Sequence, residues 1–302
     1  MRSNLLKHLT SLLTPQPPRA SLPIFAILFG LYASTAAAIT GGSVVEPNSQ
    51  MALRTVGIFN VKTANACTGT LITKDIVVTA GHCVVSKKED LIVIFETQFP
   101  NKVGQTDKLN PQNIRTIKTM VLHDDFKNMD EEGGDYGDIG VIKLDSPAPE
   151  NYLITPLLRD ETLLRKDDTV TLAGYGYSYE ESKVTDRNDP DLPAALAEGR
   201  GYCNNYKTKC FLQIVKGDGQ LREVQVTIAG LRTKDMILNE SYQKATCRGD
   251  SGGPAFIEIN GKTVLAGVTS RTLTDADCGY AQGVKTLIPH YYQWLSQIIQ
   301  SL

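Results

Sequence analysis

The chain has 302 residues, of which 41% are hydrophobic and 21% charged, a balance typical of a soluble globular protein and not of a disordered chain. Its length is enough for one large domain or for two smaller ones with their own cores. The formal net charge of −2 lacks the basic excess on which nucleic-acid binding depends, so no nucleic-acid partner is predicted. The six cysteines are an even number, which favours disulfides in an exported protein.

Residues 1–38 have the pattern of a secretory signal peptide. Two arginines and a lysine precede the first acidic residue, an apolar run covers 22–33, and the small residues Ala36-Ala37-Ala38 follow. This order predicts cleavage after Ala38 and a secreted or extracytoplasmic protein. The alternative is an uncleaved membrane anchor, since the uncharged stretch approaches the length that spans a bilayer. Cleavage would leave 264 residues with a net charge of −5, because the leader holds three basic residues and no acid.

After this leader the chain consists mainly of short β-rich runs separated by turn residues. In chain order the runs cover 55–59, 70–72, 76–79, 91–95, 139–144, 170–173, 223–228 and 263–269. Short strands at this spacing favour an antiparallel sandwich or barrels over alternating strands and helices. Apolar residues at helical spacing occur only near the end, where 289–302 is predicted to be a helix.

Two polar segments interrupt the strand pattern. Residues 124–138 are rich in acids, and residues 178–200 contain two prolines and few apolar side chains. The acidic run does not match the spacing of a calcium loop, so it is interpreted as a solvated loop and no metal site is predicted.

Three short stretches carry the residue types of nucleophilic catalysis: 78–83, 137–144 and 247–254. His82 taken alone could be a core histidine, and Asp138 taken alone could be a turn residue. The third stretch is more specific, because three glycines surround Ser251 in Gly249-Asp-Ser-Gly-Gly. Such a tight turn exposes several backbone N–H groups and presents a hydroxyl beside a nest that can bind an oxyanion.

In this order the three stretches resemble the trypsin/chymotrypsin family of serine endopeptidases. The resemblance runs from Ile39-Thr-Gly-Gly42 to the terminal helix, so it covers the whole chain after the leader. It implies an all-β fold of two packed antiparallel six-stranded β-barrels with a C-terminal α-helix. Residues 39–155 would form the first barrel, and residues 156–302 the second barrel and the helix. It also implies a secreted hydrolase that cleaves peptide bonds through an acyl-enzyme and requires no cofactor.

The resemblance assigns a role to each residue of a triad. Ser251 is the nucleophile, His82 is the general base and then the general acid, and Asp138 orients the imidazole. A serine hydroxyl is a poor nucleophile near neutral pH, so a neutral imidazole must accept its proton during attack. The N–H groups of Gly249 and Ser251 are expected to bind the oxyanion. Three other acids lie nearby but outside the matching turn before a strand: Asp124, Asp125 and Asp135.

The resemblance also selects one of the fifteen connectivities that six cysteines allow. One bridge joins a strand to the segment of the histidine, a second braces the specificity pocket, and the last two cysteines are left to pair locally. The predicted bridges are Cys67–Cys83, Cys247–Cys278 and Cys203–Cys210.

Activation in this family depends on a new N-terminus. A freed hydrophobic residue inserts its ammonium beside the acid that precedes the nucleophile, here Asp250. Ile39 resembles that residue, but Ala38 stands where activatable zymogens usually carry a basic residue. The predicted signal cleavage falls at this same bond, so we hypothesise that export itself creates the active N-terminus. The alternative is cleavage a few residues earlier, followed by trimming by a second protease.

Specificity is expected to depart from that of trypsin. Trypsin-type members carry an aspartate six residues before the nucleophile, where this chain has Ala245. A pocket narrowed by Thr272 then favours medium apolar side chains. The alternative is a basic preference, if Asp275 or Asp277 in the loop before Cys278 turns into the pocket. The predicted substrate-binding residues are Ala245, Thr246, Arg248, Ser270, Thr272 and Gly283.

Two arginines leave a further choice open. Arg271 stands where the family commonly has a tryptophan, and Arg248 lies three residues before the nucleophile. They could attract acidic substrate residues, or they could be solvated surface side chains.

The resemblance implies protein or peptide substrates, proteinaceous inhibitors and a monomeric enzyme, with membrane association only if the leader stays uncut. A hypothesis from another class is an inactive family member that acts as a secreted or membrane-anchored binding protein. Such members usually lose the serine or the histidine, whereas Ser251 and His82 are both present.

Overall fold

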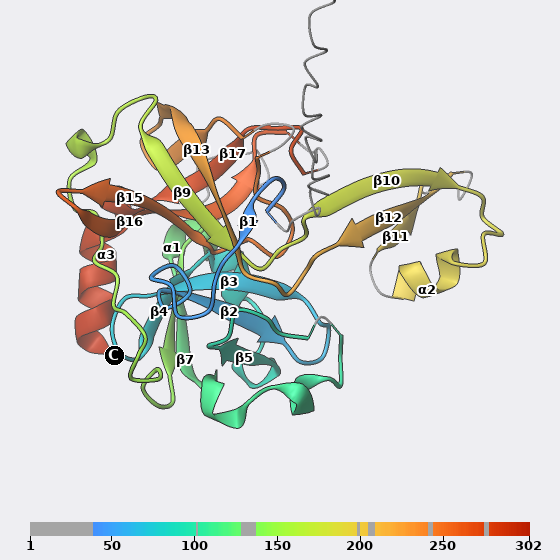
Figure 1. Ribbon diagram of the computed structural model, residues 1–302, viewed down its shortest axis with the longest axis horizontal. Coiled ribbons are helices and arrows are strands. Elements are labelled where there is room, and N and C mark those ends of the chain that lie inside the picture. The colour runs from blue at the N-terminus through green and yellow to red at the C-terminus, as the bar shows by residue number, and fades with distance from the viewer. Residues whose placement is uncertain are drawn as a thin grey trace, which may run out of the picture. The chain divides into compact units, whose positions relative to one another are not determined.

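Two antiparallel β-sheets carry most of the chain in the computed structural model (Figure 1). The structure describes residues 39–100, 102–127, 137–197, 200–204, 209–240, 244–274 and 278–302. The chain separates into two units, 1–35 and 36–302, and the first unit, like the whole predicted signal peptide, lies outside the described residues. None of the helices in the described ranges is both long enough and apolar enough to cross a membrane.

The first sheet takes its strands from the segment between Thr55 and Leu144, in the order β6-β5-β2-β3-β4-β8-β7. Its strands are β2 (Thr55–Asn60), β3 (Ala66–Leu71), β4 (Ile76–Thr79), β5 (Leu91–Ile94), β6 (Ile114–Arg115), β7 (Ile117–Leu122) and β8 (Gly140–Leu144). Alternate side chains point inward, and the inner ones form a core with Val56, Ile58 and Val77 fully or almost fully buried. This sheet is a nearly closed barrel.

The second sheet closes on itself, because β13 pairs with both β14 and β9. Its strands are β1 (Ser43–Val44), β9 (Thr169–Gly174), β13 (Arg222–Leu231), β14 (Asp235–Leu238), β15 (Pro254–Ile259), β16 (Lys262–Thr272) and β17 (Gly283–Leu287). The two-residue β1 comes from the start of the described chain and pairs with β13 of this barrel. In each sheet one strand has two residues and the other six are longer, so the prediction of two six-stranded barrels is confirmed.

The predicted terminal helix is also confirmed, as α3 (Ile288–Ser301). Pro289 lies in its first turn, where a missing N–H costs nothing, and Tyr291 and Leu295 are buried. They pack in a cluster that contains Val78 of the first sheet and Val268 of the second. Helix α3 therefore seals the place where the two barrels meet.

Short helices connect the strands. The described ones are η1 (Gly81–Val84), η2 (Lys88–Asp90), η3 (Thr106–Lys108), η4 (Pro111–Asn113), α1 (Asp124–Lys127) and η5 (Glu161–Leu163).

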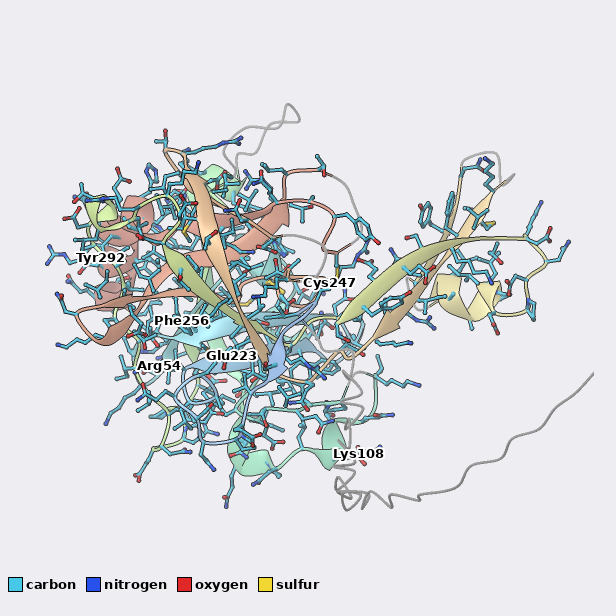
Figure 2. The ribbon with its side chains drawn as sticks, turned by 45° about the horizontal axis from the view of Figure 1, so that its top comes forward. Arg54, Lys108, Glu223, Cys247, Phe256 and Tyr292 are labelled. Carbon is cyan, nitrogen blue, oxygen red and sulfur yellow. A yellow bond between two sulfur atoms is a disulfide. The ribbon has the colours of Figure 1, made fainter. Side chains whose placement is uncertain are left out.

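The polar segment 178–200 was expected to interrupt the strands, and it instead contributes to a third sheet in the order β10-β12-β11. The elements are β10 (Tyr179–Thr185), α2 (Leu192–Ala197), β11 (Gly201–Cys203) and β12 (Cys210–Lys216). We call residues 178–216 the arm, which extends away from the barrels (Figure 1). Figure 2 labels Cys247 near the base of the arm, and Sγ of Cys247 lies 3.8 Å from Oε2 of Glu180.

The structure contains three disulfides, and they join the same pairs that the sequence analysis named. The bridges are Cys67–Cys83, Cys203–Cys210 and Cys247–Cys278.

Candidate active site

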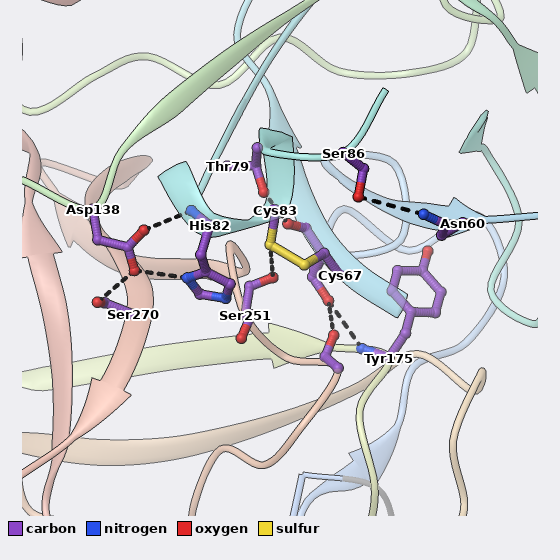
Figure 3. The surroundings of a disulfide bond; sticks show 12 residues. Asn60, Cys67, Thr79, His82, Cys83, Ser86, Asp138, Tyr175, Ser251 and Ser270 are labelled. Atoms are coloured by element: carbon purple, nitrogen blue, oxygen red, sulfur yellow. Dashed lines mark hydrogen bonds and ion pairs between the residues drawn. A yellow bond between two sulfur atoms is a disulfide. The ribbon is translucent and has the colours of Figure 1, made fainter. Parts of the chain in front are cut away.

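Paired strands bring His82 and Asp138 together. His82 lies in η1 directly after β4, and Asp138 lies directly before β8, while β4 and β8 are antiparallel neighbours. Asp138 holds the histidine at two points: Oδ2 is 2.8 Å from Nδ1 of the ring, and Oδ1 accepts a 2.9 Å bond from the backbone N–H of His82 (Figure 3). This double contact fixes the ring and turns its Nε2 away from the carboxylate.

Asp138 is 4% exposed and accepts a third bond, from the Ser270 hydroxyl at 2.7 Å. Burial raises the pKa of Asp138, but the contacts with His82 and Ser270 outweigh it and hold the pKa below its ordinary value. The carboxylate is therefore ionised near neutral pH. Ser270 was expected to bind substrate, and in the structure its hydroxyl supports the acid.

A tight glycine-containing turn presents Ser251. Gly249 and Gly252 have φ angles of 95° and 80°, in the left-handed region that favours glycine. A Cβ on Gly252 would lie 1.9 Å from Oγ1 of Thr79, so a larger residue does not fit there. The backbone N–H of Thr68 donates to the Ser251 carbonyl at 2.7 Å and ties the turn to the first barrel. Figure 3 shows Ser251 beside the His82 ring and the Cys67–Cys83 bridge.

The residue before Ser251 is a fully buried acid. Asp250 is 0% exposed, and its carboxylate accepts bonds from the backbone N–H groups of Gly176 and Cys247, both at 2.8 Å. Burial raises the pKa of Asp250 to about 7, although these two bonds oppose the shift. Two N–H donors do not neutralise a buried carboxylate, so this position favours a neutral acid or a nearby cation.

Ile39 lies inside the second barrel. It is 0% exposed in the core cluster of that barrel, and the next residue, Thr40, pairs with Ala245. The φ angle of Ile39 is 46°, which is strained for a β-branched residue.

A cavity of about 450 Å³ adjoins the serine and histidine. Its lining includes Cys67 and Cys83 on one side and Arg200 and Gln213 of the arm on another. Nothing in the composition of residues 178–200 indicated that the arm reaches the site. Gln213 lies outside that polar segment, and it is brought beside Ser182 only because β12 pairs with β10.

The predicted pocket residues lie together on the second barrel. Thr272 of β16 is directly opposite Gly283 of β17, while Ala245 and Thr246 are 1% and 5% exposed. A Cβ on Gly283 would lie 1.8 Å from Oε1 of Glu240. A carboxylate therefore fills the space beside this glycine.

Sequence reasoning missed the partner of that carboxylate. Glu240 and Lys285 are both 0% exposed, with Nζ 2.6 Å from Oε1. Thr246 joins them: its N–H and hydroxyl donate to Oε2 of Glu240 at 2.6 and 2.7 Å, and it accepts from Lys285 at 2.9 Å. The available signal was a lysine in the otherwise uncharged run Gly283-Val-Lys-Thr-Leu287.

The two arginines that the sequence left open are each paired with an acid. Arg271 Nη2 lies 2.6 Å from Oδ2 of Asp235, whose side chain is 3% exposed. Arg248 Nε lies 3.0 Å from Oε1 of Glu180, while the arginine itself is 62% exposed. Arg271 is thus part of a partly buried ion pair, and Arg248 remains at the surface beside the cavity.

The other acids named from the sequence pair elsewhere, lie in a neighbouring helix or fall outside the described residues. Asp125 Oδ2 lies 3.0 Å from Nζ of Lys234. Asp124 lies in α1. Asp135, Asp275 and Asp277 lie outside the described residues.

Two β-barrels that bring together a serine, a histidine and a buried aspartate have the architecture of a serine protease. The family model described as Trypsin matches residues 39–295, and the chain belongs to this family.

Curated relatives agree with that assignment. The chain is 28% identical to the clotting factor G beta subunit of Tachypleus tridentatus, over 86% of this chain and 79% of the relative. It is 27% identical to the venom plasminogen activator Haly-PA of Gloydius brevicauda, over 86% and 87%. It is 24% identical to chymotrypsin-like elastase family member 1 of Canis lupus familiaris, over 88% and 94%. The family is one of hydrolases that act on proteins, and proteins are the implied substrates.

Proposed function

We propose that the protein is a secreted serine endopeptidase that uses Ser251, His82 and Asp138. The observation that carries this proposal is the two-point contact of a buried, ionised Asp138 with His82, beside the turn that presents Ser251. A structure kept only for binding does not need this contact, so the arrangement favours catalysis over the binding-protein alternative.

The reaction follows from these positions. The Ser251 oxygen attacks the scissile carbonyl while Nε2 of His82 accepts its proton. The N–H groups of Gly249 and Ser251 stabilise the oxyanion. Nε2 then gives the proton to the leaving amine as the C–N bond breaks, and water hydrolyses the acyl-enzyme by the same steps in reverse order. Asp138 stabilises the imidazolium throughout.

The direct test is a cleavage profile on a peptide library, with purified protein that begins at Ile39. We expect hydrolysis of internal peptide bonds. Absence of hydrolysis by folded protein with this N-terminus would favour the binding-protein alternative.

Activation by loss of the leader explains two features of the interior. With residue 38 attached, Ile39 holds a strained φ angle of 46°, and this constraint disappears when the Ala38–Ile39 bond is cut. The freed ammonium could then neutralise the buried carboxylate of Asp250. We therefore propose that cleavage after Ala38, on secretion, orders the site.

The pH dependence of stability is expected to differ between two forms of the protein. Burial raises the pKa of Asp250 from an ordinary 3.8 to about 7 in the folded chain, and we expect the same shift in a form that begins at Ala37. The folded state then holds a proton that the unfolded state has lost. The free energy of unfolding falls by about 1.4 kcal/mol per pH unit between these values. In the form that begins at Ile39 the ammonium keeps Asp250 ionised, and we expect this fall to be absent.

Urea unfolding at pH 4.5, 5.5 and 6.5 measures this difference, and other titrating groups cancel between the two forms. The matched control is Asp250→Asn in the longer form. It is expected to remove the decrease of the free energy of unfolding with rising pH. Equal slopes in the two forms would contradict activation through Ile39.

The Glu240–Lys285 pair bears on the side chain that the pocket accepts. Glu240 fills the space beside Gly283 and Lys285 neutralises it, so this carboxylate is not left for a substrate cation. With Thr272 on the opposite strand, this packing supports a preference for short apolar side chains before the scissile bond. It narrows the expectation of medium apolar residues that came from the sequence.

Removing one member of this pair is expected to destabilise the fold. Glu240→Ala leaves the Lys285 ammonium buried without its carboxylate, which costs about 3–5 kcal/mol of the free energy of unfolding. The double variant Glu240→Ala/Lys285→Met removes both charges and is expected to recover most of this loss. Urea unfolding measures both, and a double variant no more stable than Glu240→Ala would contradict the pairing.

A further inference from the structure

The arm has two different faces. Directly opposite residues of antiparallel strands point to the same side of a sheet, so the strand register sorts the side chains. We name one side the tyrosine face and the other the helix face. The tyrosine face carries Glu180 and Val215, then Ser182 and Gln213, then Val184, Phe211 and Tyr202. The helix face includes Lys183, Leu212, Gly201 and Ile214.

Helix α2 covers the helix face beside Gly201, whereas Lys183 and Ile214 on the same face are exposed. A Cβ on Gly201 would lie 3.3 Å from Cβ of Ala195 in α2, so the helix packs directly on this side. Leu192 and Ala195 of α2 are each 3% exposed. The apolar side of α2 thus finds its partner within the arm.

Two of the three residues in the outer row of the tyrosine face are exposed, and Phe211 between them is half-buried. Val184 is 60% exposed and Tyr202 is 50% exposed, although both are apolar enough to be favoured inside proteins. The rings of Tyr202 and Phe211 are stacked, with centroids 4.7 Å apart and planes 12° apart. Single exposed hydrophobic residues are common, but two of them flanking a half-buried Phe211 in one row across three strands form a patch of the kind that marks interaction sites.

This patch continues into the catalytic cavity. Gln213 lies two residues along β12 from Phe211 on the same face, and it lines the cavity together with Ser251. The N–H of Gln213 donates to the carbonyl of Arg200 at 2.7 Å, and Arg200 also lines the cavity. At the base of the face, Glu180 binds Arg248, a third lining residue. The tyrosine face is therefore the outward extension of one cavity wall.

We propose that the tyrosine face binds the part of a protein substrate that follows the scissile bond, and that it selects an aromatic residue there. The proposal rests on the proposed endopeptidase function. The residues assigned to the acyl side, Thr272 and Gly283, lie on β16 and β17. The cavity instead lies against the Cys67–Cys83 bridge and the arm, so a chain leaving over Gln213 is on the leaving-group side.

The chemistry of the patch fits this occupant. Two stacked rings and a β-branched side chain offer a flat apolar surface on which a third aromatic ring can pack. One such contact is expected to tighten binding roughly threefold to tenfold. An extended peptide alternates its side chains, so the effect is expected at one or two positions only.

The test measures binding to the Ser251→Ala protein that begins at Ile39, so it does not depend on hydrolysis. The probes are fluorescein-labelled peptides of alanine and glycine, with one tryptophan placed at successive positions after a central alanine. Matched peptides carry serine at the same position. Fluorescence anisotropy is expected to show a roughly threefold to tenfold lower Kd for tryptophan at one or two positions. The added change Tyr202→Ser/Val184→Ser is expected to abolish this gain.

The matched control is Ile214→Ser/Leu196→Ser, which changes two exposed apolar residues of the arm away from the tyrosine face. It is expected to keep the gain, and circular dichroism checks that each variant is folded. The proposal would be overturned if tryptophan lowered the Kd at no position, or if it still lowered the Kd in the Tyr202→Ser/Val184→Ser variant. A dimer in sedimentation that dissociates on Tyr202→Ser would assign the face to a second copy and also overturn it. If protein with an intact Ser251 fails to hydrolyse peptides, the proposed endopeptidase function is wrong. The lower Kd for tryptophan peptides is measured on Ser251→Ala protein, so it tests the role of the arm separately.

Discussion

Ser251→Ala is expected to lower kcat for a peptide substrate by about 10⁶-fold, the largest single effect in the protein. The change removes the atom that forms the acyl-enzyme, so His82 and Asp138 have no proton to transfer. The turn itself remains, because its shape depends on Gly249 and Gly252. KM is therefore expected to change little.

Steady-state kinetics on a cleaved library peptide measures this loss. Ser146→Ala, at an exposed position outside the site, is the control and is expected to keep the wild-type kcat. The residual rate of Ser251→Ala is expected to exceed that of water by about 10³–10⁴, because the oxyanion donors are still in place. A loss below tenfold would remove Ser251 from the mechanism.

Asp138→Asn is expected to lower kcat by about 10⁴-fold. An amide can hold the ring of His82 in place, but it favours the tautomer in which Nε2 carries the proton and cannot accept one from Ser251. It also removes the negative charge that stabilises the imidazolium. The backbone N–H of His82 can still donate to the amide oxygen, so the fold is expected to persist.

Asp125→Asn is the matched control, since Asp125 was the neighbouring alternative and pairs with Lys234. We expect its kcat to stay within about threefold of the wild type, because it lies outside the catalytic contacts. A large loss in Asp125→Asn with a small one in Asp138→Asn would exchange the two assignments. Comparison of the kcat–pH profiles separates loss of the acid from partial unfolding.

Local patterns explain why much of the fold and site could be predicted. The turn around Ser251 depends on neighbouring glycines, and the contexts of His82 and Asp138 are set by the strands that flank them. The short β-rich runs alternate or are wholly apolar, as barrel strands require, and most begin and end within a few residues of the observed strands. Each of these signals lies within about ten residues of chain.

The arm could not be predicted for the opposite reason. Strand β10 has only one partly buried face and is therefore rich in polar residues, so its composition is that of a loop. Its partner β12 begins 25 residues after β10 ends, beyond the reach of a local pattern. The exposed Val184 and Tyr202 become meaningful only when pairing brings them into one row.

The buried Glu240–Lys285 pair and the partly buried Asp235–Arg271 pair were missed because each joins distant segments. Lys285 meets Glu240 across 45 residues, and Arg271 meets Asp235 across 36. A charged residue in a predicted strand does not reveal which distant residue it pairs with. The alternation of polar and apolar residues also assigns such a residue to the solvent-exposed side of the strand. Specificity was therefore the least predictable property, since both pairs border the predicted substrate pocket.

The most direct test of the endopeptidase assignment is labelling with a fluorophosphonate that reacts with activated serines. We expect the protein that begins at Ile39 to carry one adduct, located on Ser251 by peptide mass spectrometry, and the His82→Ala variant to carry none. Failure of the folded protein to react, or an adduct on another serine, would contradict the account.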